Sequence, residues 1–321
     1  MGRATAPALA SIPSRFAPMA TEQGEELWSG LGNSFVIVRE TSETQGAAMV
    51  EMARRRCAEA GVDGLVTVGA LDGGERVMMR IWNSDGSLGA VCGNGIRCVA
   101  RYARAHNLAS GEHVAVRTSA GHDVQCELLA DGGVRVDMGP PVLEAAQVPF
   151  DATSAAGKGT WPNAFLLPVA AGRLVPGTVV GMGNPHVVFF ADDVGPAPAA
   201  DASEAEVHAQ LDACMRTFAP TMAAGGGAFP DGVNVHVAHV RAREGRIVVA
   251  HWERGAGPTL ACGTGSCATA VAAVLSGRLA GSLAAFSPVV VRVPSGGELT
   301  IALTAGRVSM AGAAERMDGA R

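Results

Sequence analysis

Two stretches of this chain repeat one another, and this repeat restricts the fold more than any other feature of the sequence. The first runs from Trp82 to Cys98 and the second from Trp252 to Cys267. In each, a Trp ends an apolar run, and a Cys follows at the same spacing inside Cys-Gly-x-Gly, as Cys92 and Cys262. An Ala-rich, helix-like segment comes next. We therefore expect two copies of one loop, each placing a thiol directly before a helix N-terminus.

The repeat extends upstream of both loops. Residues 32–39 are matched by 183–190, residues 63–69 by 231–237, and residues 76–82 by 246–252. The extra length of the second copy falls between its Gly-Asn and Asp-Gly motifs. A repeat of this length indicates a duplicated domain rather than a solenoid. We predict two similar halves about a pseudo-two-fold axis, with both Cys loops in the cleft between them.

Turn sequences and hydrophobic periodicity divide the chain further. Strands are predicted at 31–38, 63–68, 76–82, 114–117, 123–129 and 134–138, and helices at 47–60 and from about 95 to 106. We place an N-terminal domain at 26–138 and a C-terminal domain at 139–312. Residues 313–321 form a C-terminal tail that can return to the first domain. Residues 1–25, rich in Ala, Pro and Ser, are predicted to be a disordered tail, with a short transit peptide as the alternative.

Composition excludes several functional classes. The formal net charge of −5 over 321 residues gives no electrostatic support for nucleic-acid binding. No apolar run approaches the roughly 18 residues of a membrane span. Seven cysteines without a secretory signal indicate a reducing compartment, and we expect the cytoplasm. Their spacings within the two loops are not those of a metal site, so no metal is expected.

The chemistry available to the two loops follows from their position. A helix N-terminus offers unpaired N–H groups and partial positive charge, which bind carboxylates and lower the pKa of an adjacent thiol. Two such loops suggest a carboxylate held between two helix ends with a sulfur on either side. Inverting a carbon centre by proton transfer needs a base on one face and an acid on the other, and a thiolate and a thiol can fill both roles.

A pyridoxal cofactor is not expected. It would need a Lys for its Schiff base, and the only Lys, Lys158, sits in a linker-like stretch. The helix-end N–H groups and exclusion of water would stabilise the carbanion instead.

At these residues the sequence resembles the diaminopimelate epimerase family, cofactor-independent two-cysteine enzymes of lysine and cell-wall precursor synthesis. The match covers about residues 27 to 312 in six ordered motifs: Gly-Leu-Gly-Asn-Ser-Phe (30–35), Asn-x-Asp-Gly-Ser (83–87), Cys-Gly-Asn-Gly-Ile-Arg-Cys (92–98), Gly-Asn-Pro-His (183–186), Glu-Arg-Gly-Ala-Gly (253–257) and Ala-Cys-Gly-Thr-Gly-Ser-Cys (261–267). Ser34, Ser29, Pro258 and Gly64 depart from residues often found in the family.

The resemblance implies an activity and a set of site residues. The activity is interconversion of LL- and meso-2,6-diaminoheptanedioate without a cofactor, by a homodimer acting on a small amino acid. Cys92 and Cys262 are the implied acid/base pair. The implied substrate-binding residues are Asn33, Asn83, Gly93, Asn94, Asn184, Asn234, Glu253, Arg254, Gly263 and Thr264. The implied fold is α/β (α+β), two pseudo-symmetric domains, each a curved, mainly antiparallel sheet wrapped around a central helix.

Several residues have a structural interpretation beside the functional one. His186 fits substrate contact and a buried, turn-orienting role equally well. We expect His236, His239 and His251 not to be ligands, and the remaining five cysteines to be structural. Two other functions stay open: a racemase or epimerase acting on proline, hydroxyproline, histidine or aspartate, and a non-catalytic amino-acid-binding protein. The latter has no need of two thiols.

Overall fold

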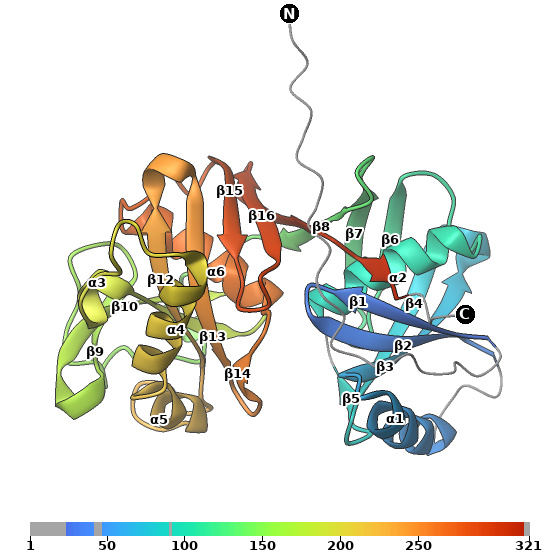
Figure 1. Cartoon of the computed structure of the whole chain (residues 1–321), viewed down its shortest axis with the longest axis horizontal. Coiled ribbons are helices and arrows are strands. Elements are labelled where there is room, and N and C mark those ends of the chain that lie inside the picture. The colour runs from blue at the N-terminus through green and yellow to red at the C-terminus, as the bar shows by residue number, and fades with distance from the viewer. Residues whose placement is uncertain (1–23, 42–46, 90–91, 318–321) are drawn as a thin grey trace, which may run out of the picture.

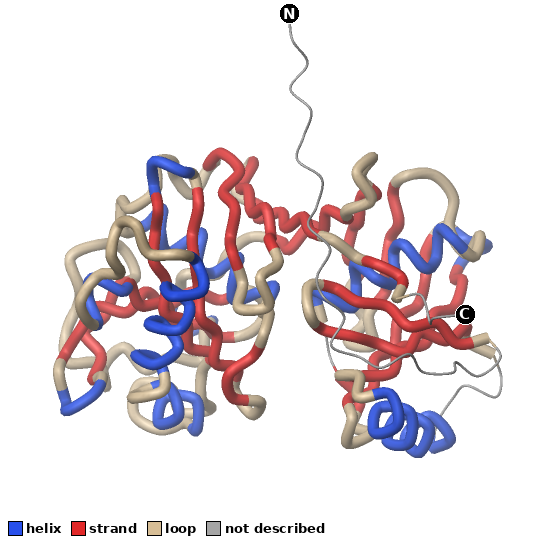
Figure 2. The backbone as a smooth tube through the Cα atoms, in the orientation of Figure 1, coloured by secondary structure: helices blue, strands red, loops and turns tan. Residues whose placement is uncertain are grey.

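The computed structural model describes residues 24–41, 47–89 and 92–317, which form two lobes, each with a central helix (Figure 1). One lobe contains the blue to green part of the chain and the other the green to orange part, and the red end returns to the first lobe. Strands make up most of both lobes and surround the central helices (Figure 2). None of the helices in these three ranges is long and apolar enough to cross a membrane.

The first half of the chain forms a mainly antiparallel sheet. Its strands are β1 (Glu25–Gly30), β2 (Asn33–Arg39), β3 (Gly64–Leu71), β4 (Arg76–Asn83), β5 (Leu88–Gly89), β6 (His113–Arg117), β7 (Asp123–Leu128) and β8 (Val134–Gly139). β2–β3 and β4–β6 pair in parallel, whereas β1–β2, β3–β4, β4–β5, β6–β7 and β7–β8 are antiparallel. The structure confirms the predicted strands with small shifts at their ends, and adds β1 and β5.

The second half repeats this topology. Its strands are β9 (Ala164–Pro168), β10 (Leu174–Gly181), β11 (Pro185–Phe190), β12 (Asn234–Arg241), β13 (Arg246–Glu253), β14 (Gly257–Thr259), β15 (Phe286–Arg292), β16 (Glu298–Thr304), β17 (Arg307–Gly312) and β18 (Glu315–Arg316). β11–β12 and β13–β15 are parallel, and the remaining neighbours from β10 to β17 are antiparallel. Strands β10 to β17 therefore correspond to β1 to β8, as the sequence repeat predicts.

The two halves are joined by their equivalent last strands. β8 and β17 pair antiparallel, the relation expected of strands exchanged by a two-fold axis. The strand after each then adds to the other half: β9 pairs with β10, and β18 pairs with β1. Each crossover covers an edge strand that would otherwise expose unpaired N–H and C=O groups. The boundary between residues 138 and 139 stays a prediction, and it falls inside β8.

A central helix lies within each sheet. α2 (Gly93–Ala105) packs against β1 to β4 and β6 to β8, and α6 (Gly263–Leu275) packs against β10 to β13 and β15 to β17. Ile96, Val99 and Tyr102 of α2 are fully buried, each stabilising the fold by roughly 1.5–3 kcal/mol. The predicted helix at about 95–106 begins two residues earlier, because Cys92 is its N-cap.

The remaining helices lie between the second and third strands of each half. α1 (Ala47–Ala60) coincides with its predicted range, and α3 (Ala191–Val194), α4 (Glu204–Met215) and α5 (Ala219–Ala224) occupy the extra length of the second half. Short 3₁₀ turns lie at Asp72–Gly74, Ala145–Gln147, Ala170–Gly172 and Ala242–Glu244. α4 was not predicted, although Ser203 and Glu206 form a capping box at its start.

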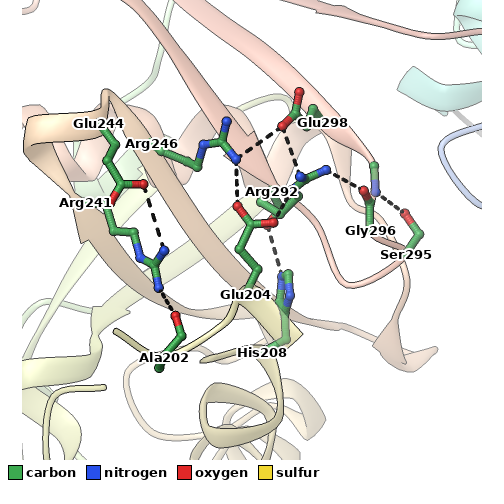
Figure 3. Close-up of polar contacts among 11 residues, drawn as sticks. Ala202, Glu204, His208, Arg241, Glu244, Arg246, Arg292, Ser295, Gly296 and Glu298 are labelled. Carbon is green, nitrogen blue, oxygen red and sulfur yellow. Dashed lines mark hydrogen bonds and ion pairs between the residues drawn. The ribbon is translucent and has the colours of Figure 1, made fainter. Parts of the chain in front are cut away.

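An ion-pair cluster fixes α4 to the sheet (Figure 3). Glu204, the first residue of α4, contacts Arg246 of β13 at 2.7 Å and Arg292 of β15 at 2.6 Å. Both arginines also contact Glu298 of β16, at 3.5 and 3.3 Å. The cluster therefore ties one helix end to three strands.

The start of the first lobe corrects one prediction. Residues 1–23 of the expected disordered tail lie outside the described residues, but β1 begins at Glu25, inside that range. The Glu25 side chain is buried and forms an ion pair with Arg56 of α1. This charge pairing holds Glu25 in the sheet, and composition alone does not predict it.

Candidate active site

The two cysteines of the repeat occupy the same structural position. Cys92 is the N-cap of α2 with φ −135° and ψ 109°, and Cys262 is the N-cap of α6 with φ −129° and ψ 108°. Each follows a short hairpin, β4–β5 in the first half and β13–β14 in the second. Since both backbones are extended at the Cys and helical immediately after it, the first helical N–H groups point toward each thiol.

The N-terminal turns of the two helices meet at one side chain. A Cβ added at Gly93 would lie 3.2 Å from the Met310 methyl carbon, and one added at Gly263 would lie 3.0 Å from the Met310 sulfur. Met310 is fully buried on β17, in the strand pair that joins the halves. The fold therefore brings the two Cys-Gly-x-Gly loops together, with glycine at the closest approach of both helices.

Cys262 is buried and hydrogen-bonded to its own helix. The Gly265 N–H donates to its Sγ at 3.4 Å, and the Thr264 hydroxyl lies 3.6 Å from it. Both contacts lower the pKa of the thiol, but burial and the Glu253 carboxylate raise it more, so the net pKa is well above its usual value. The helix end therefore lowers the pKa of this thiol as expected, but burial and Glu253 outweigh its effect in the free protein.

Cys92 has the same balance of effects. The N–H groups of Gly95 and Asn94 lower the pKa of its thiol, whereas burial, the larger effect, and Glu253 raise it. Burial also raises the pKa of Glu253, which accepts a hydrogen bond from the Thr259 hydroxyl at 2.6 Å. Glu253 thus acts electrostatically on both thiols, and it interacts directly with Cys262.

A buried arginine organises the first loop, and sequence reasoning missed it. The Arg97 guanidinium donates to the Asn94 Oδ1 at 2.9 Å and to the Gly93 carbonyl at 3.3 Å. The Asn94 amide in turn donates to the Asn33 Oδ1. Arg97 is completely buried, so it anchors the predicted residues Asn94 and Asn33 from beneath. Its signal in the sequence was an Arg one helical turn after Asn94.

The second half assembles another group of predicted residues. Asn234 donates to the Pro185 carbonyl at 3.0 Å and accepts from the Arg254 backbone N–H at 2.9 Å. His186 is fully buried, and its Nε2 lies 2.7 Å from the Asn184 Oδ1. The Arg254 side chain is exposed and donates to the Asp231 carbonyl at 2.9 Å. Asn234 thus locks the Gly-Asn-Pro-His loop to the Glu-Arg loop.

Asn83 lies apart from these groups. It ends β4, is exposed, and donates to the Ser87 hydroxyl at 2.9 Å. Its partner Ser87 belongs to the same β4–β5 turn, ahead of the Cys-Gly-x-Gly segment of the first loop. Residues 24–41, 47–89 and 92–317 contain no group of three His, Cys, Asp or Glu side chains placed to bind a metal ion.

Three of the positions that depart from the family have these local surroundings. Ser34 and Asp63 exchange two hydrogen bonds. The Ser34 N–H donates to the Asp63 Oδ2 at 2.7 Å, and the Asp63 N–H donates to the Ser34 carbonyl. A Cβ at Gly64 would lie 2.9 Å from the Trp82 carbonyl, so a larger side chain requires the strands to shift. Pro258 of β14 is exposed beside Trp252.

The chain is similar in sequence to a family of known enzymes. The family model described as diaminopimelate epimerase matches residues 27–144 and 178–317. The diaminopimelate epimerase of Moorella thermoacetica is 41% identical over 257 residues, 78% of this chain and 82% of that protein. The diaminopimelate epimerase of Desulforudis audaxviator is 40% identical over 299 residues, which cover 90% of this chain and 95% of that protein.

Solved structures share the fold at low sequence identity. A phenazine biosynthesis protein of the PhzF family from Bacillus anthracis superposes with a TM-score of 0.61 at 13% identity, covering 92% of this chain and 96% of that one. A probable proline racemase from Agrobacterium radiobacter gives 0.57 at 14% identity, covering 92% of each. These likenesses confirm the two-domain α/β fold class. With the family model matching most of its length, this chain belongs to the diaminopimelate epimerase family.

Proposed function

We propose that Cys92 and Cys262 carry out the epimerisation of LL- and meso-2,6-diaminoheptanedioate by transferring protons on opposite faces of one α-carbon. The observation that supports this most is the equivalence of the two thiols. Each caps a central helix with the same backbone geometry, and the two helix ends meet at Met310. A substrate α-carbon placed between these caps has a sulfur on each side. The protein is thus an isomerase that works by proton transfer.

The substrate carboxylate next to this carbon binds N–H groups of the two helix ends. The first turns of α2 and α6, with Gly93, Asn94, Gly263 and Thr264, provide donors and partial positive charge there. This charge also stabilises the carbanion that forms when the α-proton leaves. Glycine at the first position of both helices lets the backbone approach the ligand closely.

One thiol has to lose its proton before the reaction begins. Glu253 interacts with Cys262, and its own pKa is raised by burial, which makes its carboxylate a stronger base. We assign Glu253 as the acceptor of this proton. The pKa values of these thiols and of Glu253 are those of the free protein and contain no contribution from the substrate carboxylate. Substrate binding brings the helix-end donors, the ligand and the thiolate together.

The distal amino acid end of the substrate binds the second group of residues. Asn184, Asn234 and Arg254 lie on adjacent loops held together by the Asn234 hydrogen bonds. Arg254 is exposed and free to rotate its guanidinium from the Asp231 carbonyl to a carboxylate. Asn33 and Asn83 complete the proposed set from the first half. Relatives at 34–41% identity carry the diaminopimelate epimerase name, so the alternative racemase substrates are not favoured.

The assembly and compartment are also proposals. We propose a homodimer acting in the cytoplasm on this small amino acid, without nucleic acid. The family resemblance supports the dimer, and free cysteines throughout the described residues suit a reducing compartment. Light scattering after size-exclusion chromatography measures the assembly directly, and a monomer at micromolar concentration contradicts it.

The test of the proposed function is α-proton exchange in D₂O with purified LL-diaminopimelate. Cys92→Ala and Cys262→Ala should each abolish epimerisation, because one face of the carbon then has no acid or base. Cys214→Ala is the matched control, since this half-buried thiol of α4 lies outside both loops. Near-normal turnover in either loop variant rules out the two-base mechanism, and rapid exchange of proline instead changes the substrate assignment.

A further inference from the structure

Three histidines of the second half form a continuous hydrogen-bonded chain. His186, His236 and His251 come from the neighbouring strands β11, β12 and β13, and each is at most 1% exposed. The His186 Nδ1 lies 2.9 Å from the His236 Nε2, and the His236 Nδ1 lies 2.9 Å from the His251 Nδ1. The other ring nitrogen of His186, Nε2, contacts the Asn184 Oδ1 at 2.7 Å. The chain thus runs from a proposed substrate-binding residue into the core.

The first half shows that the fold does not need these imidazoles. His236 and His251 face each other in β12–β13, at the register position that Val66 and Ile81 occupy in β3–β4. His186, two residues after its Gly-Asn asparagine, corresponds to Phe35. Phe35, Val66 and Ile81 are all buried. Since burying polar groups costs free energy that apolar side chains do not, the three histidines require an explanation beyond packing.

Hydrogen-bond continuity limits the chain to two arrangements. Burial lowers the pKa of His186 to about 3 and that of the other two well below the usual value, so all three rings are neutral. A neutral imidazole donates from one nitrogen and accepts at the other. The donors therefore all point toward Asn184, or all point away from it. In the first case Asn184 accepts through its oxygen and turns its NH₂ group outward, and in the second its amide is reversed.

The equivalent asparagine of the first half has only one arrangement. Asn33 accepts from Asn94, and Asn94 accepts from Arg97. Arginine has no acceptor, so this chain can only donate toward Asn33. It leaves the Asn33 NH₂ group for a ligand. The histidine chain reaches the same result at Asn184 only if its donors point toward the site.

The far end of the histidine chain lies beside a pocket. The His251 Nε2 is buried and has no hydrogen-bond partner among the described residues. With His208, Asp212, Pro258 and Leu260 it lines a pocket of about 300 Å³ between α4 and the β13–β14 hairpin. When the donors point toward Asn184, this nitrogen is an unpaired acceptor, and when they point away from Asn184 it carries an unpaired N–H.

We propose that His236 and His251 are positioning residues: through His186 they hold Asn184 with its NH₂ group toward the substrate, in the arrangement that leaves the buried His251 Nε2 as an acceptor. The role of Asn184 as a carboxylate donor rests on the proposed function. The direction of the hydrogen bonds in the histidine chain does not rest on the proposed function, because it is a property of the free protein. A substrate carboxylate needs a donor, so its binding favours the same arrangement.

The direct test is ¹⁵N NMR of the histidine rings in the free protein at neutral pH. The proposal requires a protonated Nε2 in His186 and in His236, and a protonated Nδ1 with a bare Nε2 in His251. The reverse pattern, or a charged ring in the chain, overturns it. This measurement needs no turnover, so it stands even if the protein fails to epimerise diaminopimelate, which is a failure of the proposed function alone.

The functional test replaces His251 with its counterpart from the first half. In His251→Ile the chain is cut at its outer end and Asn184 is free to rotate, so KM for LL-diaminopimelate should rise about fivefold, the equivalent of one neutral hydrogen bond, with kcat nearly unchanged. His251→Gln keeps a donor and an acceptor and should restore most of the loss. His239→Gln, also on β12 but outside the chain, is the control.

The outcomes separate positioning from packing. A wild-type KM in a folded His251→Ile variant overturns the proposal, as does an equal loss in His239→Gln. If kcat of His251→Ile falls by as large a factor as its KM rises, and His251→Gln shows no recovery, the role is purely structural and the proposal is also overturned. His236→Val is a weaker test, because His236 packs against Gly265 beside Cys262, where a Cβ would lie only 2.4 Å from its ring.

Discussion

Replacing Gly265 with Ala tests the packing that holds the Cys262 loop. A Cβ at this position would lie 2.4 Å from the His236 Cε1, 2.8 Å from its Nε2 and 3.0 Å from the Cys262 Sγ. All three distances are far inside van der Waals contact. The His236 ring cannot move aside easily, because both of its nitrogens are hydrogen-bonded within the core. The strain therefore falls on the Cys loop as well as on the histidine.

The equivalent glycine of the first half supplies a matched control. A Cβ at Gly95 would lie 3.0 Å from the terminal methyl carbon of Met79 and 3.7 Å from the nearest atoms of Cys92 and Phe35. A methionine end is flexible and can rotate away. Gly→Ala within a helix also stabilises by up to about 1 kcal/mol. Gly95→Ala should therefore be close to neutral or slightly stabilising.

For Gly265→Ala, overpacking of about 1–3 kcal/mol outweighs the same helix gain. We expect a loss of about 1–2 kcal/mol in the free energy of unfolding, measured by urea denaturation. The Gly265 N–H also donates to the Cys262 Sγ, so kcat should fall at least tenfold. Equal stability and activity in Gly265→Ala and Gly95→Ala would refute this reasoning.

Three further predictions concern other parts of the molecule. Arg254→Gln should reduce kcat/KM on LL-diaminopimelate by a factor corresponding to about 2–4 kcal/mol, because a distal carboxylate loses its charged partner, and initial rates on the long substrate and on simple amino acids check this. Mild oxidation of the free protein should inactivate it reversibly through a Cys92–Cys262 disulfide, and mass spectrometry without that cross-linked peptide contradicts the prediction. Burial raises the pKa of Cys57 to about 11 and that of Cys98 and Cys267 to about 12, above the ordinary 9.0. These thiols therefore favour the folded state below pH 9.0, and this contribution to stability is lost as the pH rises through their folded pKa values. Urea denaturation at pH 8 and at pH 10.5 should show a lower midpoint at the higher pH, and equal midpoints contradict it.

The internal repeat made the topology predictable. The Trp-to-Cys spacing and the Gly-Asn and Asp-Gly motifs are local patterns, so both copies can be recognised within this one sequence. They located the strand pairs β3–β4 and β12–β13 and placed Cys92 and Cys262 before helices. The order of the strands in each half follows from the same repeat, since two copies of one sequence pattern bury their apolar residues in the same way.

The contacts between distant segments were decided only by the tertiary structure. Nothing local in Glu315-Arg316 shows that it pairs with β1, because pairing depends on which edge strand is left exposed after the other half has formed. α4 has a short capping box, but its position depends on ion pairs to Arg246 and Arg292, which are far away in the sequence.

The histidines and Arg97 show the same limit within the site. Alternation in β12 and β13 predicts which side chains point inward, but it cannot show that His236 and His251 meet across the pair. Arg97 looks like a surface residue of an amphipathic helix until β17 and Ala313 close over it. Burial depends on the packing of segments from both halves, so a polar residue is identified as an internal anchor only when the whole fold is present.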